Sequence, residues 1–169
     1  MAKTALITSA TTCEQRPGHA VIPLEIVIDT REQNPWEFSL PVIRACLASG
    51  DYSLTGFESE ISIERKSLGD LVQSLTWERQ RFERELARLS EYQRACVIVE
   101  GSLSDVHAQK YRSQAHPSAV VGSTVALFLD YNVPFFFCST RLLASDYCER
   151  ILMKFYKRAA GSRAELQKG

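Results

Sequence analysis

The chain has 169 residues, with 20 Lys and Arg against 20 Asp and Glu, so its formal net charge is zero. This length suits one globular domain that buries a core without disulfides or structural metals. With 45% hydrophobic and 24% charged residues the composition excludes a disordered chain, and any nucleic-acid binding must come from local charge clusters or bound metal ions.

The first 22 residues are predicted to form a polar, irregular arm without the continuous apolar core of a secretory signal. No segment approaches the roughly 18 uninterrupted apolar residues of a membrane span. Five scattered cysteines without a Cys-x-x-Cys pair argue against a disulfide framework and a zinc site. We therefore expect no membrane association and a cytoplasmic location.

Short β-patterned segments come first along the chain. Strands are predicted over residues 23–30, 42–48, 50–55 and 60–66. The first is a β-branched run that ends in Asp29, which is typical of a buried strand with a polar group at its carboxyl end.

After Lys66 the apolar pattern becomes helical. Helices are predicted over residues 67–75, 77–94, 116–131 and 140–160, with buried strands over residues 94–101 and 133–139. Strands followed by alternating helices and strands indicate an α/β domain, a mixed sheet with helices on both faces. The predicted units are an arm over 1–22, a domain over 23–160 and a tail over 161–169.

The two strands around residues 56–59 bring charged side chains together. If those four residues form a hairpin loop, Asp51 lies directly opposite Glu64. Directly opposite residues share a face of the sheet, with Cβ atoms about 5 Å apart. Strand alternation adds Lys66 to that face and directs the isoleucines of the same strand into the core.

Two carboxylates held this close repel each other, and one would ordinarily take up a proton. A divalent cation between Asp51 and Glu64 removes the conflict, since Mg²⁺ favours hard oxygen ligands and Mn²⁺ can substitute for it. In a nuclease the ion neutralises the phosphodiester, orients water and stabilises the leaving oxygen, while Lys66 can orient or deprotonate the water. A surface hairpin with cross-strand ion pairs is the alternative that these residues leave open.

The helix predicted over residues 77–94 carries a basic stripe. Arg81, Arg84 and Arg88 recur at i, i+3 and i+7, and they could contact phosphates independently of sequence. Ordinary pairing along the helix, such as Arg81 with Glu85, is the alternative.

The chain contains two tryptophans, Trp36 and Trp77. Either could stack on an unpaired base. Tryptophans more often anchor a core or a loop, and we expect that role for both.

Four stretches occur in an order that resembles the XPF-type nuclease domain: IVIDTREQ, GDYSL, ISIERKSLGDLVQSL and RQRFERELARL. That family belongs to the restriction-endonuclease-like, PD-(D/E)xK metal-dependent nucleases. Its motif, Gly-Asp followed after a gap by Glu-Arg-Lys and an Asp, is matched by Gly50, Asp51, Glu64, Arg65, Lys66 and Asp70. An upstream acidic element is matched by Asp29, Arg31 and Glu32, and the resemblance covers about residues 24–140.

The resemblance implies a restriction-endonuclease-like mixed sheet flanked by helices, and a set of catalytic residues. Asp51 and Glu64 look like the main metal ligands. Asp29 and Glu32 resemble additional acidic groups of the family, with Asp29 a further candidate ligand. Lys66 resembles the catalytic lysine.

The resemblance also implies roles for several other charged residues. Arg65 is expected to orient the acids or to contact phosphate. Arg31, Arg81 and Arg84 are candidate DNA contacts. Asp70 is expected either to orient Arg65 or to cap the following helix.

The implied function is a Mg²⁺- or Mn²⁺-dependent DNA endonuclease that acts on branched, flapped or nicked duplexes in repair or recombination. A non-catalytic DNA-binding or scaffold subunit is the alternative, although such members have usually lost the acids or the lysine that this sequence keeps. A third option is junction resolution, or nicking directed by a partner protein.

The resemblance bears on assembly as well. Apolar residues around 125–131 and in the last helix could form a homodimer face as in the family, and ordinary core packing explains them equally well. Eukaryotic and archaeal members add a tandem helix-hairpin-helix domain, which this sequence lacks. We therefore expect a stand-alone domain of the kind that phages and bacteria carry.

Overall fold

The computed structural model describes residues 22–166, so the predicted N-terminal arm lies almost wholly outside the described residues. The strands are β1 (Ile26–Asp29), β2 (Val42–Ala45), β3 (Tyr52–Leu54), β4 (Ile61–Ser67), β5 (Arg94–Glu100) and β6 (Phe135–Cys138). The helices are α1 (Leu68–Leu75), α2 (Arg79–Leu89), α3 (Leu103–His107), α4 (Pro117–Tyr131) and α5 (Arg141–Leu166).

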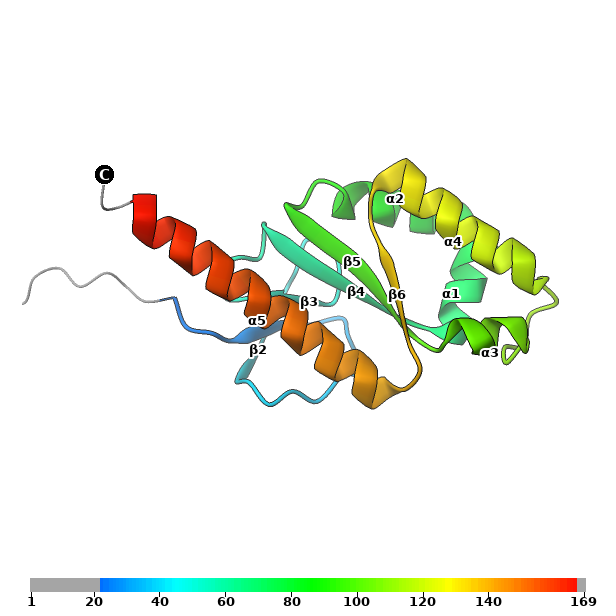
Figure 1. Ribbon diagram of the computed structural model, residues 1–169, viewed down its shortest axis with the longest axis horizontal. Coiled ribbons are helices and arrows are strands. Elements are labelled where there is room, and N and C mark those ends of the chain that lie inside the picture. Colours follow the sequence, from blue (N-terminus) through cyan, green and yellow to red (C-terminus); the bar gives the residue numbers. More distant parts are fainter. Residues whose placement is uncertain (1–21, 167–169) are drawn as a thin grey trace, which may run out of the picture.

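The strands form one mixed sheet in the order β2-β1-β3-β4-β5-β6 (Figure 1). Strand β3 runs antiparallel to both of its neighbours, β1 and β4. The pairs β1–β2, β4–β5 and β5–β6 are parallel. The predicted mixed α/β sheet is therefore confirmed, with its single antiparallel hairpin between β3 and β4 at the centre.

Helices cover both faces of the sheet. Helix α5 crosses one face, as Figure 1 shows, and its Ala144, Cys148 and Leu152 pack against isoleucines of β1, β4 and β5. Helices α1, α2 and α4 enclose a second core on the other face, around Val97 and Val99 of β5. Strand β5 is thus buried on both sides, as its continuous apolar run predicts.

Strand β4 passes directly into helix α1 because local capping starts the helix at the next residue. The Ser67 side chain accepts a hydrogen bond from the Asp70 backbone N–H at 3.1 Å, and its hydroxyl donates to Asp70 Oδ2 at 2.6 Å. A serine in this position satisfies one of the free amides of the first turn. The charged end of β4 is therefore held between a sheet and a capped helix.

The hairpin has the register predicted from its loop, since Tyr52 pairs with Ile63. Gly50 precedes the hairpin in a left-handed conformation with φ of 77°, which favours glycine. A Cβ atom at this position would lie 2.1 Å from Ser62 Oγ of the neighbouring strand. Glycine is therefore required for the chain to approach β4 closely and deliver Asp51 beside it.

The structure differs from the predicted elements in four places. Helix α5 continues to Leu166, so most of the expected tail over 161–169 is helical. Helix α2 is shorter than predicted, and the short helix α3 was not expected. Strand β6 is a half-buried edge strand rather than a buried one. No helix between residues 22 and 166 combines the length and hydropathy needed to cross a membrane.

Candidate active site

A polar cleft of about 280 Å³ lies where β4 meets helix α1. Its lining residues are Glu32, Asp51, Glu64, Arg65, Lys66, Asp70, Gln73, Ser74, Glu78 and Arg81. The predicted hairpin geometry is therefore confirmed in its main point: Asp51, Glu64 and Lys66 meet at one site.

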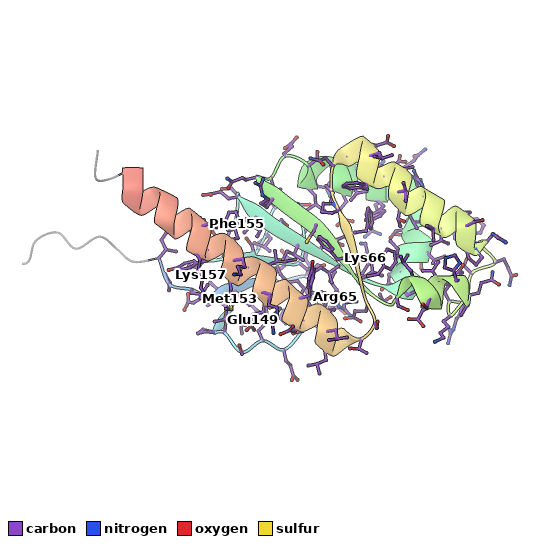
Figure 2. All side chains as sticks on the ribbon, viewed as in Figure 1. Arg65, Lys66, Glu149, Met153, Phe155 and Lys157 are labelled. Atoms are coloured by element: carbon purple, nitrogen blue, oxygen red, sulfur yellow. The ribbon has the colours of Figure 1, made fainter. Side chains whose placement is uncertain are left out.

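Strand alternation separates the charged triplet at the end of β4. Ile61 and Ile63 enter the core beneath α5, as predicted. Glu64 and Lys66 turn toward the opposite side, where Lys66 Nζ lies 5.1 Å from the centroid of the Phe82 ring of α2. Figure 2 shows Arg65 beside α5 and Lys66 farther toward α1.

Both carboxyl groups of the hairpin resist ionisation. Burial raises the pKa of Asp51 to about 6, opposed by the Arg65 backbone N–H, which donates to Asp51 Oδ2 at 2.8 Å. Glu64 is only 4% exposed, and burial together with the charge of Asp51 raises its pKa well above the ordinary value. Ionisation of one of these two acids therefore opposes ionisation of the other.

Lys66 bridges two carboxylates. Its Nζ lies 2.6 Å from Glu64 Oε1 and 3.4 Å from Glu85 Oε2. Burial opposes the charge on Lys66, but Glu64 and Glu85 outweigh it and raise the pKa of the ammonium group. Lys66 is accordingly a cation in the absence of a metal.

Glu85 of α2 is a site residue that the sequence prediction missed. The expected pairing of Arg81 with Glu85 does not form, since Arg81 pairs with Glu78 at 3.0 Å and Glu85 turns to Lys66. One sequence signal was available: Glu85 lies three residues after Phe82 and four before Leu89, along the apolar seam of its helix.

Arg65 is directed away from solvent and toward acids. Its side chain is 14% exposed, with Nε 2.8 Å from Glu100 Oε1 and a terminal nitrogen 3.4 Å from Glu32 Oε2. This arrangement favours the expectation that Arg65 orients an acid over the alternative of phosphate contact. Glu100, at the end of β5, was also missed by the sequence prediction.

The structure does not bring the Asp29 side chain into the cleft lining. Asp29 Oδ1 accepts hydrogen bonds from Arg31 N at 2.8 Å and Arg31 Nε at 2.7 Å, and Oδ2 accepts from Leu47 N at 2.6 Å. Burial opposes its ionisation, but these bonds outweigh it and lower the pKa of Asp29. In this geometry Asp29 anchors Arg31 and Leu47, and its role as a metal ligand stays a prediction.

The remaining predicted residues have distinct positions. Asp70 lines the cleft and caps α1 through Ser67, in agreement with the capping alternative. Arg81 also lines the cleft, whereas Arg84 is exposed on α2 and is not among the lining residues. Arg31 is exposed apart from its bonds to Asp29 and Leu47.

The two tryptophans differ from each other. Trp36 is buried, and its ring stacks on Tyr52 with centroids 4.8 Å apart, as expected of a core anchor. Trp77 contradicts that expectation, because it is 89% exposed in the turn between α1 and α2. It directly precedes Glu78, which lines the cleft.

The acids of the cleft fit a hydrated metal ion rather than a fully protein-enclosed one. Within residues 22–166, no cluster of three or more His, Cys, Asp or Glu side chains is arranged to hold a metal. Mg²⁺ is usually bound through one or two carboxylates and keeps several waters or substrate phosphates as ligands. The pair Asp51 and Glu64, both with raised pKa, provides such carboxylates and gains from a nearby cation.

Comparison with known proteins is consistent with this geometry. The ERCC4 domain family matches residues 28–151. The 3′-flap repair endonuclease Xpf of Saccharolobus solfataricus is 30% identical over 120 residues, which are 70% of this chain and 48% of that protein. This chain therefore spans about half the length of that relative.

Solved structures give the same match. XPF from Aeropyrum pernix superposes with a TM-score of 0.62 and 25% identity, over 76% of this chain and 60% of that one. The same protein in complex with DNA gives a TM-score of 0.63 at 25% identity, over 81% of this chain and 66% of that one.

Proposed function

The chain belongs to the ERCC4 domain family and has the fold of an XPF-type nuclease domain, and from this premise we propose that it is a metal-dependent DNA endonuclease. One observation carries the proposal: Asp51, Glu64 and Lys66 line a single cleft in which both acids have a raised pKa. Buried acids that resist ionisation are expected where a cation completes the site.

The residues of the cleft have separate tasks in this proposal. Asp51 and Glu64 would hold Mg²⁺ or Mn²⁺, which supplies an activated water and stabilises the leaving oxygen. Lys66, kept as an ammonium by Glu64 and Glu85, donates a hydrogen bond that orients the water and offsets negative charge at the phosphate. Hydrolysis by this metal-activated water would leave 5′-phosphate and 3′-hydroxyl ends.

The proposed substrate is branched, flapped or nicked duplex DNA, processed in repair or recombination. Its support is the name of the flap-endonuclease relative and the likeness to an XPF bound to DNA. The exposed Trp77 and Arg81 beside the cleft supply a stacking surface and a positive charge for an unpaired strand. The proposal includes two further options: cleavage of one particular branched DNA structure, and cleavage directed to a site by a partner protein.

A non-catalytic scaffold role is the second candidate. It would leave no reason for two buried acids to share a cleft with a lysine, because replacing them by apolar residues would be less costly to stability. The retained charges therefore favour catalysis.

The test compares Asp51→Asn and Glu64→Gln with the parent on flap, fork, nicked, four-way and linear duplex DNA, with Mg²⁺, Mn²⁺ or chelator. Both variants are expected to lose cleavage, because each removes a ligand charge, and to bind DNA within a few-fold of the parent. Glu83→Gln is the matched control, since Glu83 lies on α2 and pairs with Arg79 outside the cleft.

Parental cleavage rates in Asp51→Asn or Glu64→Gln would contradict the site. A parent that cuts every DNA form alike would contradict structure-specific cleavage but not the nuclease activity.

A further inference from the structure

Glu100 is the meeting point of three segments of the chain. Its Oε1 accepts hydrogen bonds from Trp36 Nε1, from Arg65 Nε at 2.8 Å and from Arg141 at 3.2 Å. Trp36 belongs to the loop after β1, Arg65 to β4 and Arg141 to the start of α5. One carboxylate oxygen at the end of β5 therefore ties together the loop after β1, the end of β4 and the start of α5.

The Arg65 side chain extends from Glu100 to the cleft. Its guanidinium group is 5.9 Å from the centroid of the Trp36 ring, and its far nitrogen reaches Glu32, which lines the cleft. The backbone N–H of Arg65 donates to Asp51 Oδ2. The Arg65 guanidinium is thus held by Glu100 and contacts Glu32, whereas the contact of Arg65 with Asp51 is made by its backbone.

The charge of Glu100 strengthens this arrangement. Burial opposes its ionisation, but the hydrogen bonds from Arg65 and Trp36 outweigh it and lower the pKa of the carboxyl. Charge-assisted hydrogen bonds are shorter and about twice as strong as neutral ones. An amide in place of the carboxylate would keep an acceptor atom of the same shape but lose that strength.

We propose that Glu100 is a positioning residue of the active site, which fixes the Arg65 guanidinium and through it the acid Glu32. The inference rests on the proposed nuclease function and adds a residue outside the cleft to its machinery. Glu100 touches neither substrate nor metal in this proposal, so its effect is on the rate of the chemical step rather than on DNA affinity.

A matched control separates positioning from simple anchoring of the loop. Glu149 of α5 also ties the loop after β1 to this helix, since it accepts hydrogen bonds from the Ser39 backbone N–H at 2.6 Å and from the Ser39 hydroxyl. Figure 2 shows Glu149 on α5, to the left of Arg65 in this view. No hydrogen bond or ion pair joins Glu149 to Arg65 in the part of the chain that the structure describes.

The kinetic test measures kcat and KM for flap cleavage in Glu100→Gln and Glu149→Gln. Outer residues that orient catalytic groups typically cost about 10–100-fold when mutated. We expect a kcat loss of that order in Glu100→Gln with little change in KM, and near-parental kcat in Glu149→Gln. The double variant with Arg65→Lys should lose no more kcat than Arg65→Lys alone, because both act through one group.

The spectroscopic test does not depend on activity. The Nε–H resonance of Arg65, assigned by its loss in Arg65→Lys, and the Arg65 backbone amide should both shift in Glu100→Gln and stay in place in Glu149→Gln. Fluorescence emission from Trp36 should change in Glu100→Gln and stay unchanged in Glu149→Gln. It is measured in a Trp77→Phe background, because the chain has two tryptophans. If Glu100→Gln does not fold, Glu100→Asp, which keeps the charge on a shorter side chain, takes its place.

Unmoved Arg65 resonances in Glu100→Gln, or an equal kcat loss in Glu149→Gln, would overturn the inference. A parent that never cleaves DNA but shows the expected resonance shifts would refute the nuclease function and leave the positioning of Arg65 by Glu100 standing.

Discussion

Asp51 and Glu64 illustrate how a site can oppose the stability of its own fold. Burial disfavours the charge on each acid, and their mutual repulsion adds to the effect on Glu64. Lys66 offsets part of this repulsion through its 2.6 Å contact with Glu64. Without a metal ion, the burial and mutual repulsion of these two carboxylates therefore destabilise the folded protein, and a bound cation would offset this cost.

The stability of the metal-free protein should depend on Asp51 in a defined direction. The pKa of Asp51 is about 6 in the folded state against an ordinary 3.8. Between these pH values the folded protein keeps a proton on Asp51 that the unfolded chain has lost. Its contribution to stability is therefore present at low pH and falls as pH rises through this window. At pH 8 in chelator, Asp51→Asn should be more stable than the parent by roughly 1–2 kcal/mol after allowance for solvent screening, and should therefore unfold at a higher temperature.

The measurement is thermal unfolding from pH 4 to pH 8, with and without Mg²⁺. The advantage of Asp51→Asn should shrink toward pH 4, and Mg²⁺ should stabilise only the parent, because a ligand stabilises the state that binds it. A parent that is more stable than Asp51→Asn at pH 8 in chelator would contradict the prediction.

At the scale of elements, the joint between β4 and α1 decides where the chemistry lies. The strand holds Glu64 and Lys66 rigidly, and Ser67 starts α1 without an intervening loop. The turn after α1 then carries Trp77, exposed next to the lining residue Glu78. This arrangement is the basis for testing the proposed substrate, which has both a duplex and an unpaired strand.

Trp77→Ala should weaken binding to flap DNA more than to blunt duplex. Loss of base stacking on an aromatic side chain typically costs about 1–3 kcal/mol per base. Fluorescence anisotropy in a Glu64→Gln background, which is expected to be inactive, would measure both affinities, and Trp77→Phe should retain most of the binding. An equal loss on flap and blunt DNA, or no loss on either, would show that Trp77 does not stack on the unpaired strand.

At the scale of the whole molecule, exposed large apolar residues lie on α4 and on the first turns of α5, which cover opposite faces of the sheet. The exposed large apolar residues there are Val125, Phe128, Leu129, Leu142, Leu143 and Tyr147. Leu129 and Leu142 are 72% and 79% exposed, which ordinary core packing does not explain. Apolar surface of this kind commonly marks a protein interface, and a homodimer through these helices is the proposed assembly.

Charge on this surface should prevent association. Leu129→Glu and Leu142→Glu are expected to shift the protein from dimer to monomer in light scattering coupled to size exclusion, raising the dissociation constant by about tenfold or more. Val42→Glu on the edge strand β2, also exposed, is the control. A monomeric parent at high concentration would contradict the dimer.

Much of the central hairpin was predictable because its determinants are local. The loop length set the register that pairs Tyr52 with Ile63, and alternation placed Ile61 and Ile63 on one face of β4 and Glu64 on the other. The outcome for Asp29 was different. Its place at a strand end was clear from sequence, but whether its carboxylate would reach the cleft or Leu47 depended on a loop 18 residues away.

The residues that the prediction missed share one property. Glu85 meets Lys66 across 19 positions of the chain, and Glu100 meets Arg65 across 35. No periodicity relates such pairs, because helix and strand patterns report only on neighbours within a few residues. Trp77 was misjudged for the related reason that exposure of a turn depends on how α1 and α2 pack.

The sequence by itself determined the order of the elements apart from α3, and the family through the order of its motifs. It also determined the meeting of Asp51, Glu64 and Lys66, since turn length and two-residue alternation dictate this. Only the tertiary structure decided three sets of contacts: the partners of Arg65, the hydrogen bond of Asp29 with Leu47, and the ion pair of Lys66 with Glu85. These depend on distances between segments, which are set by how helices pack on the sheet rather than by any local pattern.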